Sequence, residues 1–70
     1  MAELVVHIRF EGRSADVAFA LLDVGDASSD AQVREALARH LEVPVRRLDG
    51  YVVERHENGN LTVRPEAVFG

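Results

Sequence analysis

The chain has 70 residues, no cysteine and a formal net charge of −4, from 12 acidic and 8 basic side chains. This length is that of one small domain, and the lack of cysteine excludes disulfides, thiolate catalysis and cysteine-ligated metal sites. The acidic balance argues against a general nucleic-acid binder, which usually carries a basic patch or stripe.

Two strands are predicted in the first third of the chain. Apolar and polar residues alternate over 3–11, which is typical of a strand with one buried face. Its inward set is Leu4, Val6, Ile8 and Phe10. The polar stretch 12–16 predicts a turn, and 17–24 predicts a second strand whose two faces are almost equally apolar. We assign the bulkier set, Val17, Phe19 and Leu21, to the core, which leaves Leu22 exposed unless the strand bulges there.

Residues 28–41 carry the clearest helical signal in the chain. Apolar residues recur at helical spacing at Val33, Ala36, Leu37 and Leu41. Ser29, followed three residues later by Gln32, matches a capping box, with Ser28 as a rival cap. A helix of about three turns does not persist alone, so we expect its apolar face to cover the sheet.

A connector follows the helix over residues 42–50. Pro44 limits the helix, because the residue before a proline avoids helical geometry. We expect Val43, Val45 and Leu48 to close the bottom of the core, and a single 3₁₀ turn over 45–48.

A second hairpin is predicted near the end of the sequence. Residues 51–57 predict a third strand, Asn58-Gly59 a tight turn, and 61–64 the returning strand. Because proline cannot donate to a sheet ladder, we expect regular pairing to stop or become edge-like at Pro65. This predicts one domain over residues 1–64 and a C-terminal tail over 65–70.

The element order, ββαββ, predicts an α+β fold with one helix packed on one face of a four-stranded mixed sheet. In the usual arrangement of this order the first and last strands are parallel neighbours, joined by a connection that contains the helix. Over residues 3–64, with a tail that ends at Gly70, the pattern resembles the β-grasp fold of ubiquitin-like proteins. Without an extra edge strand, it is also similar to the smaller four-stranded immunoglobulin-binding β-grasp domains.

The resemblance implies a small bacterial-type protein modifier or carrier, activated at the carboxylate of Gly70. The implied partners are an adenylating enzyme, a conjugating or processing enzyme, and a target protein. The family pattern ends in Gly-Gly, whereas this sequence ends in Phe69-Gly70, so only the last glycine matches. Val68 and Phe69 are unusually apolar for a tail, and we expect them to dock on the domain or to bind a partner.

The alternative is a protein-interaction module that forms no covalent bond. It would act through the outer sheet face, through an edge strand or by self-association. The outer face is expected to hold Val5, His7, Arg9, Thr62 and Arg64, with Val52 and Glu54 as further candidates. The sequence leaves the oligomeric state open.

No signature of an enzyme or of a cofactor site is visible, such as a Gly-rich phosphate loop or a metalloprotease histidine pair. His7, His40 and His56 are not expected to converge on a metal. Four arginines form either a solvated face or a basic patch for an acidic protein: Arg34, Arg39, Arg46 and Arg47. We expect neither a signal peptide nor a membrane span, and a cytoplasmic location.

Overall fold

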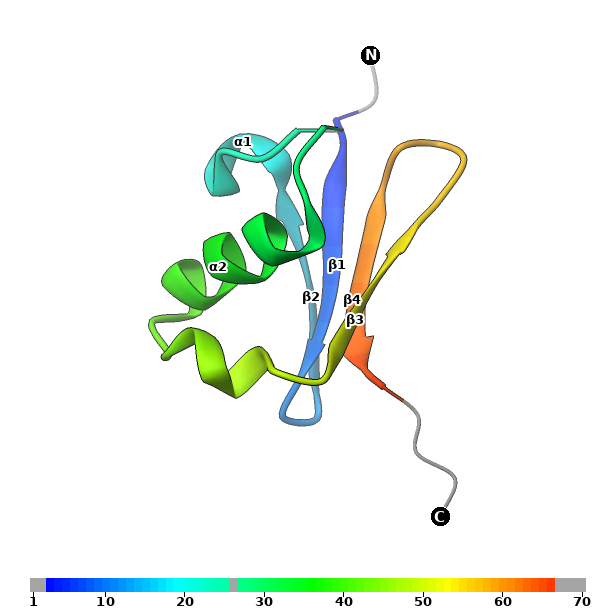
Figure 1. Cartoon of the computed structure of the whole chain (residues 1–70). Coiled ribbons are helices and arrows are strands. Elements are labelled where there is room, and N and C mark those ends of the chain that lie inside the picture. Colours follow the sequence, from blue (N-terminus) through cyan, green and yellow to red (C-terminus); the bar gives the residue numbers. More distant parts are fainter. Residues whose placement is uncertain (1–2, 26, 67–70) are drawn as a thin grey trace.

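The computed structural model describes residues 3–25 and 27–66 (Figure 1). Its elements are β1 (Val5–Phe10), β2 (Arg13–Ala18), α1 (Phe19–Leu22), α2 (Asp30–Leu41), the 3₁₀ helix η1 (Val45–Leu48), β3 (Tyr51–Arg55) and β4 (Leu61–Pro65). The strands form a four-stranded sheet in the order β2-β1-β4-β3. The central pair, β1 and β4, is parallel and both outer pairs are antiparallel. The described residues thus form the predicted small α+β fold with a mixed sheet and a parallel central pair.

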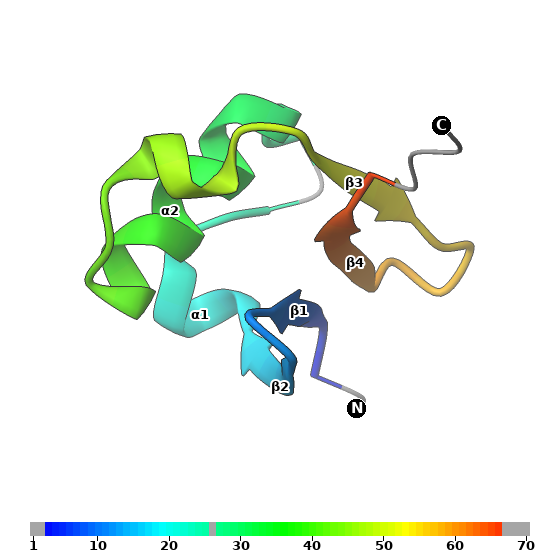
Figure 2. The ribbon, with the colours of Figure 1, turned by 90° about the horizontal axis from the view of Figure 1, so that it is seen from below.

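Both α-helices lie on one side of this sheet (Figure 2). Between the two layers lies a core of buried apolar side chains: Val6, Ile8, Val17, Phe19, Leu22, Val33, Leu37, Ala38, Leu48, Leu61 and Val63. The inward set predicted for the first strand is confirmed, because Val6 and Ile8 are buried while Leu4 and Phe10 pack against the core.

The sequence determines where α2 begins. The Ser29 backbone N–H donates to Gln32 Oε1 over 2.8 Å, and the Gln32 N–H donates to Ser29 Oγ over 3.2 Å. This is the predicted capping box, and Ser29 rather than Ser28 is the cap. Arg55 then ties the helix start to the sheet, because its Nη2 donates to Asp30 Oδ1 over 2.8 Å.

The region that follows the first hairpin differs from the prediction. The turn is only Glu11-Gly12, both at positive φ (51° and 77°), and β2 already begins at Arg13. The predicted second strand instead ends in the helical turn α1, in which Phe19 and Leu22 are buried and Leu21 is 71% exposed. The assignment of Leu21 to the core was wrong. A spacing of three residues places Phe19 and Leu22 on one side of a helical turn, and this side faces the core.

The connector and the last hairpin agree with the sequence in most respects. The 3₁₀ turn is where it was predicted and Leu48 is fully buried, but Val45 is 46% exposed and does not close the core. Leu61 and Val63 point inward as predicted, and β3 ends at Arg55. Pairing continues slightly beyond the predicted domain boundary, because Tyr51 is paired with Pro65 and the Glu66 N–H donates to the Gly50 carbonyl over 3.0 Å.

Candidate protein-recognition surface

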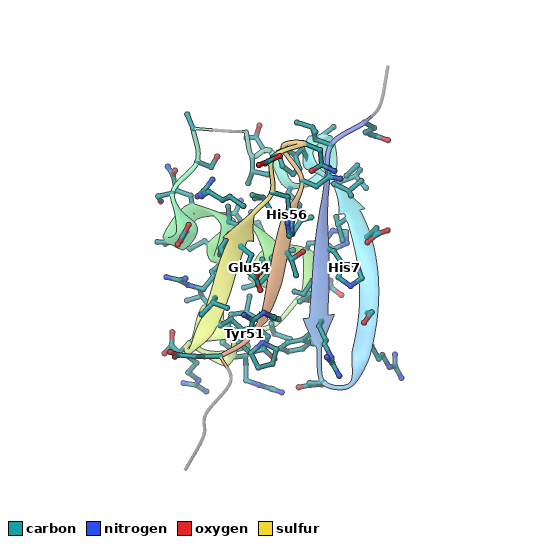
Figure 3. The ribbon with its side chains drawn as sticks, turned by 90° about the vertical axis from the view of Figure 1, so that its right-hand side faces the viewer. His7, Tyr51, Glu54 and His56 are labelled. Carbon is teal, nitrogen blue, oxygen red and sulfur yellow. The ribbon has the colours of Figure 1, made fainter. Side chains whose placement is uncertain are left out.

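The sheet face away from the helices is not covered by any described element (Figures 2 and 3). The strand register decides which side chains share it, because paired residues point to the same side of a sheet. His7 is paired with both Asp16 and Thr62, and Thr62 in turn with Glu54. We call this surface the outer face and define it by Val5, His7 and Arg9 of β1, Asp16 of β2, Thr62 and Arg64 of β4, and Val52 and Glu54 of β3.

All seven residues that the sequence assigned to this face lie on it. Asp16 was missed because it fell in a predicted turn. His56, just after β3, was also missed, although its Nε2 lies 2.7 Å from Thr62 Oγ1. The Asn58-Gly59 turn explains this contact, because it returns the chain so that the start of β4 lies beside the end of β3.

Polar side chains on the outer face are held by contacts across neighbouring strands. His7 Nδ1 lies 2.6 Å from Asp16 Oδ1, and Arg64 Nε pairs with a carboxylate oxygen of Glu54. The four side chains are about half exposed, and such surface pairs contribute about 0–1 kcal/mol each. Their main consequence is orientation, since each contact restricts the conformations of the two side chains.

Arg9 differs from Arg64, the other arginine of the outer face. Both line a hollow of about 420 Å³ at the end of the sheet, together with Glu11, Gly12, Pro65 and Glu66. The Arg64 guanidinium is already engaged with Glu54 and with the carbonyl of Pro65. Among residues 3–25 and 27–66, the Arg9 side chain has no hydrogen bond or ion pair. Its charge is therefore available to an acidic group of a partner.

The other predicted arginine set is dispersed. Arg34 Nη1 donates to the Tyr51 carbonyl over 3.4 Å at the β3 edge. Arg47 pairs with Glu11 and lies over the Phe10 ring, 5.7 Å from its centroid. Arg39 lines a shallow hollow beside α1. Three of the four candidates thus occupy separate places, and no common basic patch forms from them.

The histidines are also distributed over the fold. His7 and His56 contact residues of the outer face, whereas His40 is exposed near the end of α2. In the described part of the chain, no cluster of three or more His, Asp or Glu residues is placed to hold a metal ion.

Three predicted site residues, Val68, Phe69 and Gly70, lie outside the described residues. No described helix combines the length and the apolar character that a membrane crossing requires. No protein-family model, no curated protein and no solved structure matches the chain.

Proposed function

We propose that this chain is a ubiquitin-like β-grasp domain that recognises another protein through its outer face. The strand order β2-β1-β4-β3, with α2 between the two hairpins and a parallel central pair, supports the β-grasp assignment. Both hairpins would then present one continuous surface, away from the helices, to the partner.

The observation that carries this proposal is the Arg9 side chain, which has no hydrogen bond or ion pair among the described residues and lies on a sheet face that no described element covers. The chain as a whole is acidic, with a net charge of −4, and at one hollow of this face Arg9 and Arg64 lie with two acids, Glu11 and Glu66. Arg64 is engaged with Glu54 and Glu11 with Arg47, so an acidic side chain of a partner would complement Arg9. Val52, paired with Arg64 in the sheet and half-buried, offers a small apolar contact beside the charges.

The test is affinity capture from a lysate of the source cells with three forms of the chain. Wild type is compared with Arg9→Glu and with Arg46→Glu, which makes the same charge change on the exposed surface of η1. We expect partners that are enriched by wild type to be lost with Arg9→Glu and retained with Arg46→Glu. Equal losses with both variants, while circular dichroism shows that both are folded, would contradict recognition through the outer face.

A second candidate is the carrier function at Gly70, which is favoured by one feature of β4. This central strand ends at Pro65, and both Pro65 and Glu66 are exposed, so the chain leaves the middle of the sheet at an accessible point. In such a carrier the C-terminal carboxylate attacks the α-phosphorus of ATP and releases pyrophosphate. Both candidate functions assume a cytoplasmic location.

Mass spectrometry can test the carrier function directly. The chain is incubated with ATP and the adenylating enzyme encoded nearest to its gene, and the products are searched for an adenylate, thioester or isopeptide at Gly70. A variant that lacks Gly70 should give none of these products. If this variant were as active as wild type, the carrier function would be rejected, and recognition through the outer face would be unaffected.

A further inference from the structure

We propose that two copies of this chain associate through the free edge of β2, in a two-fold arrangement that places Leu21 of each copy against the apolar residues of a hollow of the other. Three features lie on the β2 side of the described molecule, away from the outer face: an unpaired strand edge, a protruding leucine and a hollow.

The two edges of the sheet differ in how they are covered. At β3, Arg34 donates to the Tyr51 carbonyl and Arg55 is tied to the start of α2, so helix and strand side chains occupy that edge. At β2 no described residue pairs on the side away from β1. A strand edge with unpaired N–H and C=O groups is a template for another strand.

The hairpin fixes which backbone groups of β2 are free. Phe10 and Arg13 flank the two-residue turn, and the pair that closes such a turn is hydrogen-bonded. Because hydrogen-bonded and non-hydrogen-bonded pairs alternate, Ala15 also faces β1, whereas the backbone groups of Ser14 and Asp16 face away from it. A second chain can therefore bond at Ser14 and Asp16 without disturbing β1.

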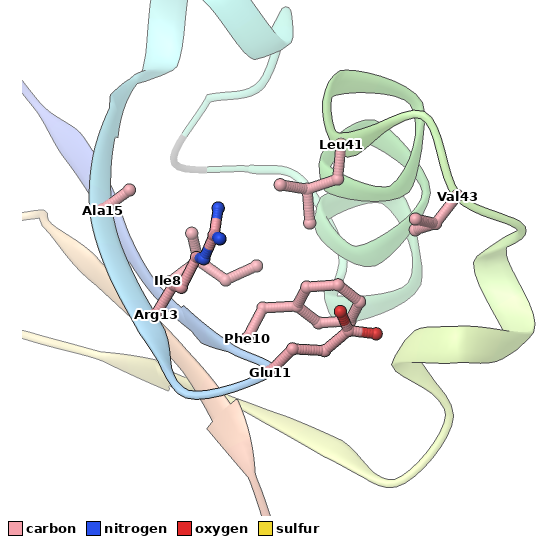
Figure 4. Close-up of a pocket in the computed structure, with 7 residues that line it drawn as sticks. All are labelled: Ile8, Phe10, Glu11, Arg13, Ala15, Leu41 and Val43. Carbon is pink, nitrogen blue, oxygen red and sulfur yellow. The ribbon is translucent and has the colours of Figure 1, made fainter.

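A hollow of about 470 Å³ lies beside the first half of β2, between the hairpin and the end of α2 (Figure 4). It is lined by Ile8, Phe10, Ala15, Leu41 and Val43, with Glu11 and Arg13. Ala15 and Arg13 of β2 belong to its lining, so the hollow reaches the edge strand. Five of the seven lining residues are apolar, and Glu11 and Arg13 add one acid and one base, so the hollow has a mixed apolar and polar lining.

Leu21 protrudes at the other end of the same strand. It belongs to α1, which directly follows Ala18, and it is 71% exposed. It is the more exposed of two large apolar residues that protrude in the described chain. The side of the molecule next to β2 therefore carries a protrusion at one end and a hollow at the other.

Antiparallel pairing of two β2 strands brings these features together. With the two-fold axis at Ala15, Ser14 of each copy lies opposite Asp16 of the other, and residues 13–17 of both copies are paired. An axis at Asp16 places two carboxylates opposite each other, which is unfavourable, and an axis at Ser14 pairs only residues 13–15. The Ala15 register is therefore favoured, and in it α1 of each copy lies next to the hollow of the other.

Charged side chains flank both features. Asp23, Arg39 and His40 line the surface next to Leu21, and Glu11 and Arg13 line the hollow. Each surface therefore offers an acid and a base to the other copy, and Glu11 is already paired with Arg47. Every contact between the two surfaces occurs twice, as in any isologous interface.

Cysteine cross-linking tests both the association and its register, because the natural chain has no cysteine. In the Ala15 register, Ala15→Cys places two Cα atoms about 4.5 Å apart, within the range of a disulfide. Ser14→Cys lies on the other face and two residues off register, so it should cross-link no faster than Glu35→Cys on α2. Rapid cross-linking of Ala15→Cys alone supports the proposal, and faster cross-linking of Ser14→Cys overturns the register.

Sedimentation equilibrium of the cysteine-free chain provides the second test. We expect the mass to approach twice the 7.7 kDa of one chain as concentration rises. Leu21→Asp should raise the dimer Kd by about a hundredfold, since two apolar contacts are lost. Val45→Asp, at the other exposed apolar residue, should leave the Kd unchanged. A wild-type chain that stays monomeric, with Ala15→Cys no faster than Glu35→Cys, overturns the association.

Discussion

Alanine substitution of Leu22 and of Leu21 distinguishes the helical turn α1 from the strand that the sequence favours. Leu22 is 5% exposed and Leu21 is 71% exposed. Truncation of a buried leucine to alanine removes apolar burial and leaves a cavity, which typically lowers the free energy of unfolding by about 2–5 kcal/mol. For Leu22→Ala we expect a decrease of about 2–3 kcal/mol, because α1 lies at the margin of the core. Leu21→Ala should change the free energy of unfolding by less than about 0.5 kcal/mol.

These values are large relative to the stability of so small a domain. At typical values per residue, the free energy of unfolding of a 70-residue chain is about 4–10 kcal/mol. With a urea dependence of about 1 kcal/mol per molar, Leu22→Ala should lower the urea midpoint by about 2–3 M. Far-UV circular dichroism of dilute, monomeric protein measures this midpoint. If Leu21→Ala lowered the urea midpoint more than Leu22→Ala, β2 would continue through these residues as a strand, and the assignment of α1 would be wrong.

Two further predictions concern the start of α2 and the second hairpin. Ser29→Ala should lower the free energy of unfolding by about 1 kcal/mol, because the Gln32 N–H loses its acceptor, and the urea midpoint should fall accordingly. Gly59→Ala should cost about 1–3 kcal/mol, since Gly59 has φ +92° and a Cβ there would lie 3.0 Å from a methyl carbon of Leu4. Gly25→Ala, where a Cβ meets nothing within 4 Å, is the matched control and should stay within about 0.5 kcal/mol. An equal loss at both glycines would contradict the placement of the second turn.

The elements with a strong and unambiguous pattern could be predicted from the sequence. Regular alternation specified the buried face of β1, and the helical spacing together with Ser29 and Gln32 specified α2. The parallel pairing of β1 and β4 followed from the order of the elements, because the intervening α2 returns the chain to the same end of the sheet.

The region from Glu11 to Leu22 could not be predicted in the same way. Over 17–24 both faces are apolar, so the strand and the helical turn bury similar side chains and alternation carries no information. The first turn places Glu11 at φ 51°, a conformation that glutamate seldom adopts, so Gly12 marked a turn but nothing indicated that the turn begins at Glu11 and ends at Gly12. The error moved β2 toward the C-terminus, and it concealed both the free edge at Ser14 and the place of Asp16 on the outer face.

The two proposed surfaces use different atoms of the same strands, so they can fail independently. Asp16 directs its side chain to His7 on the outer face, while its free backbone groups face the β2 edge. A two-fold axis perpendicular to the sheet would leave both outer faces on one side of a continuous, doubled sheet. Arg9→Glu should therefore remove partner binding and leave the cross-linking of Ala15→Cys intact, whereas Leu21→Asp should have the opposite effect. A partner with two acidic segments would bind the dimer more tightly than either single copy, because its second contact becomes intramolecular.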